Sequence, residues 1–336
     1  MNSPTISVIM AVYNAEPYLH ESIQSILTQT FDNFEFFIVD DCSTDASRKI
    51  ITDYAQKDAR IKLLFNKERS YPAKTRNFAL QQSKGKYIAI LDADDAALPE
   101  RLERQIEYLE NNLDIFLLGT EATFLNSSGN VLKKSKPPRD SLTIEKTLPL
   151  RNCILHSTVM YRNEEGIRYR EKLIFSHDYD LFLLLLSKKK KMMNLDKVLV
   201  KRRLAPNSVG ETKTIKQALF MEKAREFYQQ RVRYGHDHYD SFSPTSIMDM
   251  DETALSRDPR LLKIMIYDAL KKRKKPELNS YSRKYLADQG YFNRYLFFYL
   301  FSYLPRSFIN VAVETERLIK TKCTFFHKIT KELFRR

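Results

Sequence analysis

Three carboxylates stand within four residues, at Asp92, Asp94 and Asp95, directly after the apolar run Tyr87–Leu91. Like charges this close together repel one another unless a cation joins them. Mg²⁺ and Mn²⁺ prefer carboxylate oxygens together with phosphate oxygens as ligands. The cluster therefore indicates a site for a divalent metal that carries a nucleotide diphosphate. A solvated turn that caps a helix beginning near Pro99 is the alternative.

A second acidic pair, Asp40 and Asp41, follows the apolar run Phe34–Val39. The next residues, Ser43–Asp45, are natural N-cap residues for a helix behind them, but capping does not explain the two aspartates themselves. A carboxylate at a strand end can accept the imide N–H of uracil. Selection of a nucleotide base and helix capping alone are the two interpretations of this pair.

Short apolar runs alternate with helical patterns through the first ninety residues. Strands are expected at 6–12, 34–39, 61–65 and 87–91, and helices at 18–30, 45–56 and 72–83, with Gly85 at the last turn. This alternation predicts an α/β fold with a doubly wound, mainly parallel sheet flanked by helices. Ligands of such sheets bind beyond the carboxyl ends of the strands, where the acidic residues would meet.

The composition is that of a folded protein, with 336 residues of which 43% are hydrophobic and 29% charged. Its 7 glycines form neither a G-x-G-x-x-G loop nor a P-loop, so phosphates must be bound in another way. The 3 cysteines are too far apart for a disulfide framework or a zinc site. No apolar run reaches the roughly 18 residues of a membrane-spanning helix, and the first residues do not resemble a secretory signal. We therefore expect a cytoplasmic protein.

Four motifs, in order and at the expected spacing, resemble those of the GT-A fold, family 2 glycosyltransferases: Ser7–Asn14, Val39–Asp45, Arg76-Asn77 and Leu91–Asp95. The resemblance covers roughly residues 4–208. It implies a nucleotide-sugar donor, usually a UDP-sugar, a divalent metal ion (Mn²⁺ or Mg²⁺), and a displacement that inverts the anomeric carbon. One departure is the segment 70–72, Ser-Tyr-Pro, which lacks the glycine usually found before the Arg76 helix.

The resemblance implies a role for each residue on the donor side. The residues that would hold the uracil are Ala11, Tyr13 and Asp41, with Asp40 beside them and Glu16 near the same loop. The remaining contacts would come from Arg76 at the diphosphate or ribose, Asp92 at the ribose, Asp94 at the metal and Asp95 at the donor sugar. These assignments follow the family, whereas the residues themselves show only clustered acids.

An inverting transfer needs a base that takes the proton of the acceptor hydroxyl, and a carboxylate is a usual choice. The segment Ser176–Leu181 resembles the family's Glu-Asp-x-x-Leu segment, which makes Asp178 the base and Asp180, on the acceptor side, the fallback. His177 replaces the usual glutamate. The structural alternative is that Asp178 or Ser176 only caps the following helix.

Two further segments resemble parts of the family's site. Asn152–Met160 is expected to be a loop that enters a strand on the acceptor side, where His156 would bind acceptor or pyrophosphate; a structural histidine is the alternative. In Arg202–Ser208, Arg203 would neutralise phosphate charge on the departing UDP. Ala205 stands where many relatives carry a histidine.

The region 257–336 carries 19 basic and 7 acidic residues, a net charge of about +12 out of the total +14. Its pattern predicts three basic helices interleaved with aromatic residues. Such a surface suits an anionic membrane, so one hypothesis is peripheral attachment to the inner face of the plasma membrane. The alternatives are a helical face that packs its aromatic residues onto the rest of the protein, and an RNA-binding patch; the resemblance argues against nucleic acid.

We expect a GT-A domain in residues 1–210, with a nucleotide-binding half (1–98) and an acceptor-side half (99–210), followed by a helical, basic region in residues 211–336. The predicted activity is an inverting hexosyl- or N-acetylhexosaminyltransferase that moves one sugar from a UDP-sugar to a hydroxyl of a glycan or polyprenyl-linked glycan. Two other classes stay open. A nucleotidyltransferase would need a basic, glycine-rich loop that residues 10–17 lack, and a non-catalytic membrane- or RNA-binding protein would make the acids incidental.

Overall fold

The structure, a computed structural model, describes residues 3–204, 214–250, 259–271 and 274–289. Its contacts divide the chain into two units. The first contains residues 1–213 and 219–244, and the second contains residues 214–218 and 245–336. The predicted site residues all belong to the first unit, so this unit carries most of the functional argument.

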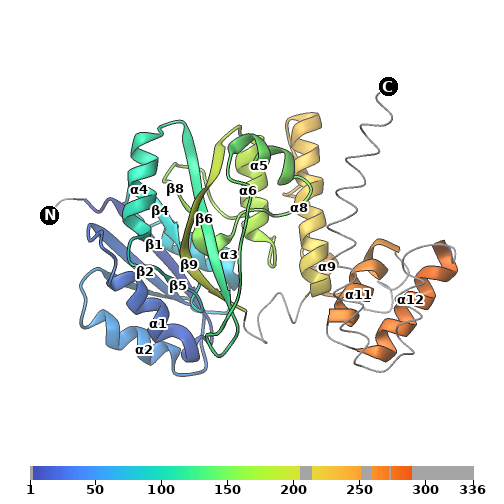
Figure 1. The fold of residues 1–336 in the computed structure, drawn as a ribbon, viewed down its shortest axis with the longest axis horizontal. Helices are drawn as coiled ribbons and strands as arrows, with labels where there is room; N and C mark the ends of the chain where they lie inside the picture. The colour runs from blue at the N-terminus through green and yellow to red at the C-terminus, as the bar shows by residue number, and fades with distance from the viewer. Residues whose placement is uncertain (1–2, 205–213, 251–258, 272–273, 290–336) are drawn as a thin grey trace. The chain divides into compact units, whose positions relative to one another are not determined.

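In the described residues, nine strands form one sheet in the order β3-β2-β1-β4-β8-β6-β9-β5, with β7 paired to β6 (Figure 1). The strands are β1 (Ile6–Val12), β2 (Phe34–Asp40), β3 (Ile61–Phe65), β4 (Tyr87–Ile90), β5 (Ala96–Ala97), β6 (Ile115–Leu125), β7 (Val131–Lys134), β8 (Met160–Arg162) and β9 (Lys191–Arg203). β3, β2, β1 and β4 are parallel, as are β6 and β9, whereas β8 is antiparallel to both of its neighbours. The predicted α/β fold with a mainly parallel sheet is confirmed.

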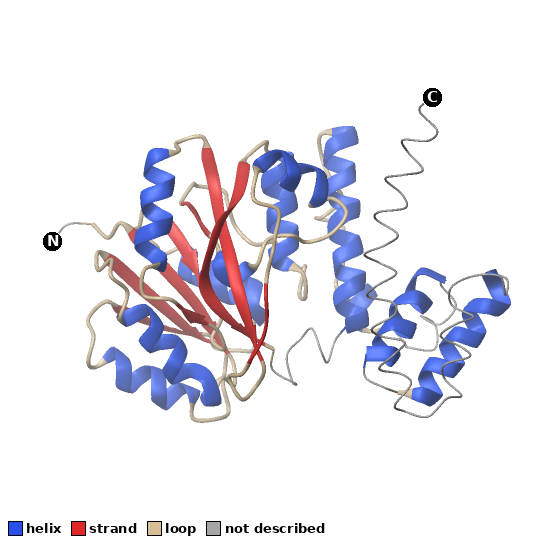
Figure 2. Cartoon of the chain, in the orientation of Figure 1, coloured by secondary structure: helices blue, strands red, loops and turns tan. Residues whose placement is uncertain are grey.

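Helices flank this sheet (Figure 2). In the first unit they are α1 (Glu16–Leu27), α2 (Ser47–Ala55), α3 (Tyr71–Leu80), α4 (Arg101–Asn111), α5 (Ser141–Thr147), α6 (His177–Ser187) and most of α8 (Thr214–Tyr234). α1, α2 and α4 share one apolar cluster with Val8 and Met10 of β1. Ile9, whose side chain points to the opposite face, is also fully buried. Both faces of β1 are therefore covered, which explains its continuous apolar run.

The predicted elements of the first ninety residues are all present, with small shifts at their ends. The strands at 6–12 and 61–65 have the predicted bounds, and each predicted helix end moves by at most three residues. α1 begins at Glu16 because Pro17 suits the first turn of a helix. α2 begins after Asp45, whose carboxylate accepts the N–H of Ser47 at 3.0 Å. The segment 152–159 leads into β8 as predicted, but it contains a short 3-10 helix, His156–Thr158, where a loop was expected.

Gly85 brings β4 close to β1. A Cβ atom at this position would lie 2.4 Å from the backbone nitrogen of Ser7, a distance that no side chain tolerates. The Gly85 N–H instead donates to the Ser7 hydroxyl at 2.9 Å. Glycine is required here because of this close approach, which places the start of β4 beside the start of β1.

The second unit contains α9 (Thr245–Met248), α11 (Pro259–Lys271) and α12 (Lys275–Gln289) in its described residues. α11 and α12 pack on each other through an apolar cluster that includes Leu262, Ile266, Leu278 and Leu286. α11 and α12 lie within the region expected to be helical and basic, and the aromatic stretch at 291–303 lies outside the described residues. Among the helices that are described, none has both the length and the apolar character needed to cross a bilayer.

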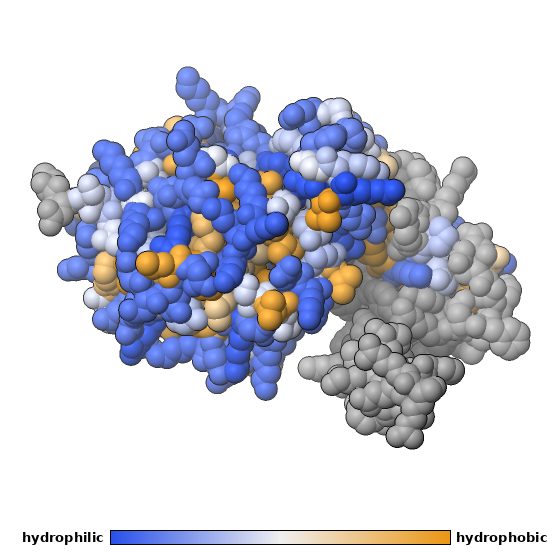
Figure 3. Space-filling view, turned by 90° about the horizontal axis from the view of Figure 1, so that it is seen from above, coloured by the Kyte–Doolittle hydropathy of each residue, from blue (hydrophilic) through white to orange (hydrophobic). Residues whose placement is uncertain are grey.

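Figure 3 shows one face of the protein coloured by hydropathy. Most of the described residues seen on that face are hydrophilic, and the hydrophobic residues form small separate patches. The described part of this face therefore offers no broad apolar surface for a partner.

Candidate active site

The carboxyl ends of β1, β2 and β4 meet at one edge of the sheet. Val12 is paired in register with Asp40, and the Asp41 N–H donates to the Val12 carbonyl at 2.8 Å. On the other side of β1, the Leu91 N–H donates to the Ile9 carbonyl at 3.2 Å. Because β2 and β4 lie on opposite sides of β1, this edge is the point where the strand order reverses, the usual ligand site of such sheets.

Asp95 is the buried member of the acidic turn after β4. Its side chain is 2% exposed, and its Oδ1 accepts the backbone N–H of Arg203 at 2.8 Å. Burial, reinforced by the charges of Asp94 and Asp92, raises the pKa of this carboxyl well above its usual range. In the structure, Asp95 therefore fastens the end of β9 to the acidic turn, and its predicted contact with the donor sugar stays a prediction.

Asp92 is the paired member of the turn. Its Oδ1 accepts a hydrogen bond from Nη2 of Arg76 at 2.6 Å, and Nδ1 of His156 lies 3.5 Å from the same oxygen. Burial opposes the charged form, but Arg76 and His156 outweigh it and hold the pKa of Asp92 well below its usual range. Asp92 is thus an anion at neutral pH.

Asp94 is the member whose carboxylate makes no hydrogen bond or ion pair to another described residue; only its own backbone N–H and the charges of Arg202 and Arg203 favour its charged form. Burial and the neighbouring charge of Asp92 raise the pKa of Asp94 to about 6. A divalent cation would relieve that repulsion. The described residues contain no cluster of three or more His, Cys, Asp or Glu side chains that could hold a metal by themselves. Asp94 therefore fits a Mg²⁺ or Mn²⁺ ion that takes most of its ligands from phosphates and water.

Arg76 and His177 form a buried pair beneath Asp92. Nη1 of Arg76, a side chain 5% exposed, lies 2.9 Å from Nε2 of His177. Burial and the Arg76 charge lower the pKa of His177 to about 3, so the imidazole is neutral and Nε2 accepts from the guanidinium. His156, also buried, meets the hydroxyl of Tyr169 through Nε2 at 2.8 Å. The structure thus brings Arg76, Asp92, His156 and His177 together, with Arg76 directed at Asp92.

Arg101 is a member of this site that the sequence analysis missed. The residue is fully buried, and its Nη2 donates to the carbonyls of Ile90 and Val159 at 2.8 and 3.2 Å. Burial lowers the pKa of Arg101 to about 9, although Asp95 and Asp92 oppose this shift. Arg101 supplies positive charge beneath the acidic turn. Its position in the first turn of the helix after three acids was the available signal, because clustered acids need a nearby cation.

The residues predicted to hold a base lie at the ends of β1 and β2. Tyr13 is 44% exposed, whereas Asp40 and Asp41 are buried. Asp40 accepts from the guanidinium of Arg48 at 2.8 and 3.0 Å and from the Ser43 N–H at 3.2 Å. Tyr13 is therefore the accessible member of this set. Ala11 belongs to β1 itself.

Glu16 performs a local structural task. Its Oε2 accepts the Ala46 N–H at 3.0 Å, and its own N–H donates to Asp45 at 3.1 Å. These bonds join the start of α1 to the start of α2. A contact between Glu16 and a base stays a prediction.

Asp178 and Asp180 lie in the first turn of α6 but in different environments. Asp178 is half-buried, and its Oδ2 accepts from the Asn152 amide at 3.3 Å. Asp180 is fully buried and paired through both oxygens with Arg170, which also pairs with Asp237 at 2.6 Å. Of the two carboxylates predicted as base or fallback, Asp178 is the one that a ligand can reach.

Arg170→Met is expected to lower the free energy of unfolding by about 3–5 kcal/mol, because it leaves the buried Asp180 without its cation. Urea unfolding of the full chain, followed by circular dichroism, measures this change. Arg104→Met is the matched control, since Arg104 forms exposed pairs with Glu100 and Glu107 and should lose less than about 1 kcal/mol. Equal effects of the two substitutions would contradict the structural role of Arg170.

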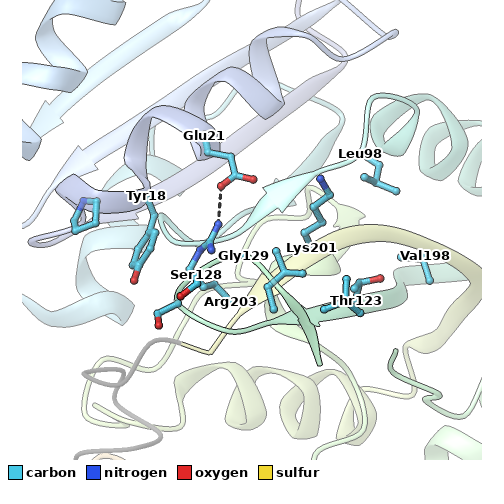
Figure 4. A pocket seen from close by; sticks show the side chains of 13 residues that line it. Tyr18, Glu21, Leu98, Thr123, Ser128, Gly129, Val198, Lys201 and Arg203 are labelled. Carbon is cyan, nitrogen blue, oxygen red and sulfur yellow. Dashed lines mark hydrogen bonds and ion pairs between the residues drawn. The ribbon is translucent and has the colours of Figure 1, made fainter. Parts of the chain in front are cut away.

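Arg203 lines a cavity of about 520 Å³ between α1, β6 and β9 (Figure 4). Its guanidinium donates to Glu21 at 2.6 Å and to the Asn126 carbonyl at 3.3 Å, and it lies 4.6 Å from the centre of the Tyr18 ring. Among the described residues, Arg203 alone of the predicted site residues lines this cavity. Its guanidinium is thus already paired with Glu21, and the predicted contact with the donor phosphates is untested.

Comparisons with known proteins identify the class of this fold and site. A model of glycosyl transferase family 2 matches residues 7–165. An uncharacterised glycosyltransferase of Methanocaldococcus jannaschii is 40% identical over 239 residues, which are 70% of this chain and 81% of that protein. The O-antigen biosynthesis glycosyltransferase WbnJ of Escherichia coli is 33% identical over 234 residues, 68% of this chain and 90% of that protein.

Two solved structures have the same fold. Residues 1–349 of S. aureus TarS, in complex with UDP, superpose with a TM-score of 0.52 at 20% identity, covering 93% of this chain and 92% of that one. The mannosyltransferase PcManGT of Pyrobaculum calidifontis, in complex with GDP-Man and Mn²⁺, superposes with a TM-score of 0.53 at 16% identity, covering 97% of this chain and 84% of that one. The fold is therefore the GT-A type of glycosyltransferases. This chain belongs to glycosyl transferase family 2, as the resemblance of its motifs implied.

Proposed function

We propose that this chain is an inverting glycosyltransferase that moves a sugar from a UDP-sugar to a hydroxyl of a glycan or polyprenyl-linked glycan in polysaccharide biosynthesis. The observation that carries the proposal is the unpartnered carboxylate of Asp94 at the edge where β1, β2 and β4 end. UDP in the TarS structure and Mn²⁺ in the PcManGT structure support a nucleotide-sugar donor with a divalent metal. Family membership favours this class over a nucleotidyltransferase or a non-catalytic binding protein.

In the proposed reaction, the acceptor oxygen attacks the anomeric carbon while the bond from that carbon to the UDP oxygen breaks. Asp178 takes the proton of the acceptor hydroxyl, since its carboxylate is reachable and only weakly held by Asn152. Asp94 holds the metal, which when bound supplies positive charge for the departing diphosphate. Arg76 keeps Asp92 charged and oriented towards the ribose side of the donor. The proposal thus separates a donor half, residues 1–98, from an acceptor half, residues 99–210.

Thermal unfolding with UDP, GDP, CDP and ADP, each with and without Mn²⁺, tests the donor site. A nucleotide at about 100 times its Kd stabilises the folded state by about 2.7 kcal/mol. For a domain of this size that energy corresponds to a rise in Tm of roughly 5–10 °C. We expect the largest rise with UDP and Mn²⁺ together. A larger rise with GDP would indicate a GDP-sugar as the donor in place of a UDP-sugar. No rise with any of the four nucleotides would contradict the donor site.

We further propose that this protein is cytoplasmic and that it binds an anionic membrane surface through the basic residues of its C-terminal region. Replacing the run Lys271–Lys275 by glutamines is expected to abolish flotation of the full-length protein with vesicles of phosphatidylglycerol and phosphatidylethanolamine, since each basic residue contributes about 1 kcal/mol. The matched control replaces Lys188–Lys191, where Lys190 and Lys191 already pair with acids of the first unit. Flotation that survives the first change, or is lost equally in both, would contradict the proposal.

A further inference from the structure

Arg69, in the loop between β3 and α3, already makes within the protein the two contacts proposed for the nucleotide base. Its guanidinium carbon lies 3.0 Å from the centre of the Tyr13 ring. Its Nη1 pairs with Oδ2 of Asp41 at 3.2 Å. Tyr13 and Asp41 are the residues proposed to hold the base. A base can therefore reach both of them only if Arg69 moves.

Three hydrogen bonds and the Arg69 guanidinium surround the carboxylate of Asp41. A carboxylate offers about four lone-pair sites. Oδ1 accepts from the Asn66 amide at 2.7 Å and from the Ser70 N–H at 2.7 Å. Oδ2 accepts from the Tyr71 N–H at 3.0 Å and forms an ion pair with Nη1 of Arg69 at 3.2 Å, whereas the hydrogen bond from that Nη1 goes to the Asp41 backbone carbonyl at 3.4 Å. An additional N–H donor at Oδ2 must therefore take the place of the Arg69 guanidinium.

Of the groups around this carboxylate, the Arg69 guanidinium can leave most easily. The Ser70 and Tyr71 donors are backbone groups, and the Asn66 amide is also bound to the Thr75 hydroxyl at 2.9 Å. Arg69 carries its donor on a long side chain that is 35% exposed. It can thus swing into solvent without unfolding the loop.

The backbone around Arg69 is anchored independently of its side chain. Tyr71 has a φ of 61°, in the left-handed region, within the segment 70–72 that lacks the glycine expected before the Arg76 helix. A non-glycine residue costs roughly 1–2 kcal/mol there, so this conformation persists only because other contacts hold it. The hydrogen bond to Asp41 and the edge contact between the Tyr71 and Phe175 rings, 6.5 Å between centroids, are such contacts.

We propose that Arg69 fills the base subsite of the unliganded protein and that the base of the donor displaces it, so that Arg69 sets the affinity and base selectivity of the site. This inference rests on the proposed function. A guanidinium and a base are both planar, stack on an aromatic ring and donate N–H groups to a carboxylate. Uracil and guanine have a ring N–H that can replace Arg69 at Asp41. Cytosine and adenine in nucleotides have none, so they compete less well.

Calorimetric titration of UDP in the presence of Mn²⁺, and of uridine, into the full chain tests this inference. In the unmodified chain the base must first break a cation–π contact worth about 0.5–2 kcal/mol, and Arg69→Met lacks this contact. We therefore expect the Kd of Arg69→Met to be lower by roughly two- to thirtyfold. Uridine carries no phosphate, so a gain for uridine cannot arise from the altered charge near a diphosphate. Arg60→Met is the matched control, because Arg60 pairs with Asp58 at 2.7 Å and lies 4.5 Å from the Phe34 ring outside the site.

Tighter binding of both UDP and uridine to Arg69→Met, with Arg60→Met unchanged, supports the inference. An equal or higher Kd for UDP in Arg69→Met overturns it, because Arg69 then does not compete with the base. A gain for UDP that is absent for uridine also overturns it, because the change then acts on the phosphates. If neither the unmodified chain nor Arg69→Met binds UDP, the proposed donor site itself is wrong. This outcome differs from the two above, in which UDP binds but Arg69 does not compete with the base.

Discussion

Asp178→Asn is expected to lower kcat by about 10²–10⁴-fold, the usual contribution of a positioned general base, while leaving the affinity for UDP unchanged. The physical reason is that asparagine keeps the shape of the side chain and its contact with Asn152 but cannot take a proton. Sugar transfer from a UDP-sugar, measured at saturating donor, gives kcat. Thermal shift with UDP and Mn²⁺ reports donor binding in the same preparation.

Two variants make the Asp178 result interpretable. Asp53→Asn changes an exposed aspartate of α2 that pairs with Lys49, and it should leave kcat within about twofold. Asp180→Asn should act on stability, because Asp180 is bound to Arg170 inside the protein. A loss of UDP binding in Asp178→Asn, or a kcat close to that of the unmodified enzyme, would remove Asp178 from the role of the base.

Asp94→Asn is expected to lower kcat by at least about 10²-fold, because a metal at a departing diphosphate is worth several kcal/mol. The Mn²⁺-dependent part of the thermal shift with UDP should disappear in the same variant. We expect the substitution not to lower the free energy of unfolding. Burial and Asp92 raise the pKa of Asp94 to about 6, so a neutral amide removes a charge that its surroundings disfavour.

The free energy of unfolding without ligand therefore distinguishes a functional from a structural Asp94. We expect it to be at least as high in Asp94→Asn as in the unmodified protein, by urea unfolding at pH 7.5. Asp178→Asn serves as the reciprocal control, since it should keep the metal-dependent shift. A marked loss of stability in Asp94→Asn would mean that the carboxylate is needed by the fold, and the metal assignment would then lack its basis.

The arrangement of the sheet could be predicted because its signals are local. β1, β2 and β4 are buried on both faces, so each reads as a short continuous apolar run. Such runs alternating with helices predict parallel strands, whose carboxyl ends share one edge. The convergence of Tyr13, Asp41 and Asp94 at that edge follows from the order of elements alone.

The charge and the accessibility of each site residue could not be predicted in the same way. Asp178 and Asp180 are two positions apart on one helix, as are Asp92 and Asp94 in one turn, and the family resemblance gives them different roles, but the sequence does not show which member of each pair a neighbouring cation neutralises. In the structure, Arg170 neutralises Asp180 and Arg76 neutralises Asp92, whereas Asp94 has no partner in the described residues and Asp178 only the Asn152 amide. Chain folding thus decides which carboxylates can act on a ligand.

By itself, the sequence determined the family, the order of the strands that carry the site and the edge where the acids meet. Only the tertiary structure decided which acids are open, that Arg101 lies beneath them, and that Arg69 covers Tyr13. The reason is physical: apolar periodicity is written along the chain, whereas the charge and accessibility of a side chain depend on neighbours from distant segments. Arg203 and Glu21, 182 positions apart and 2.6 Å from each other, are an example of such neighbours.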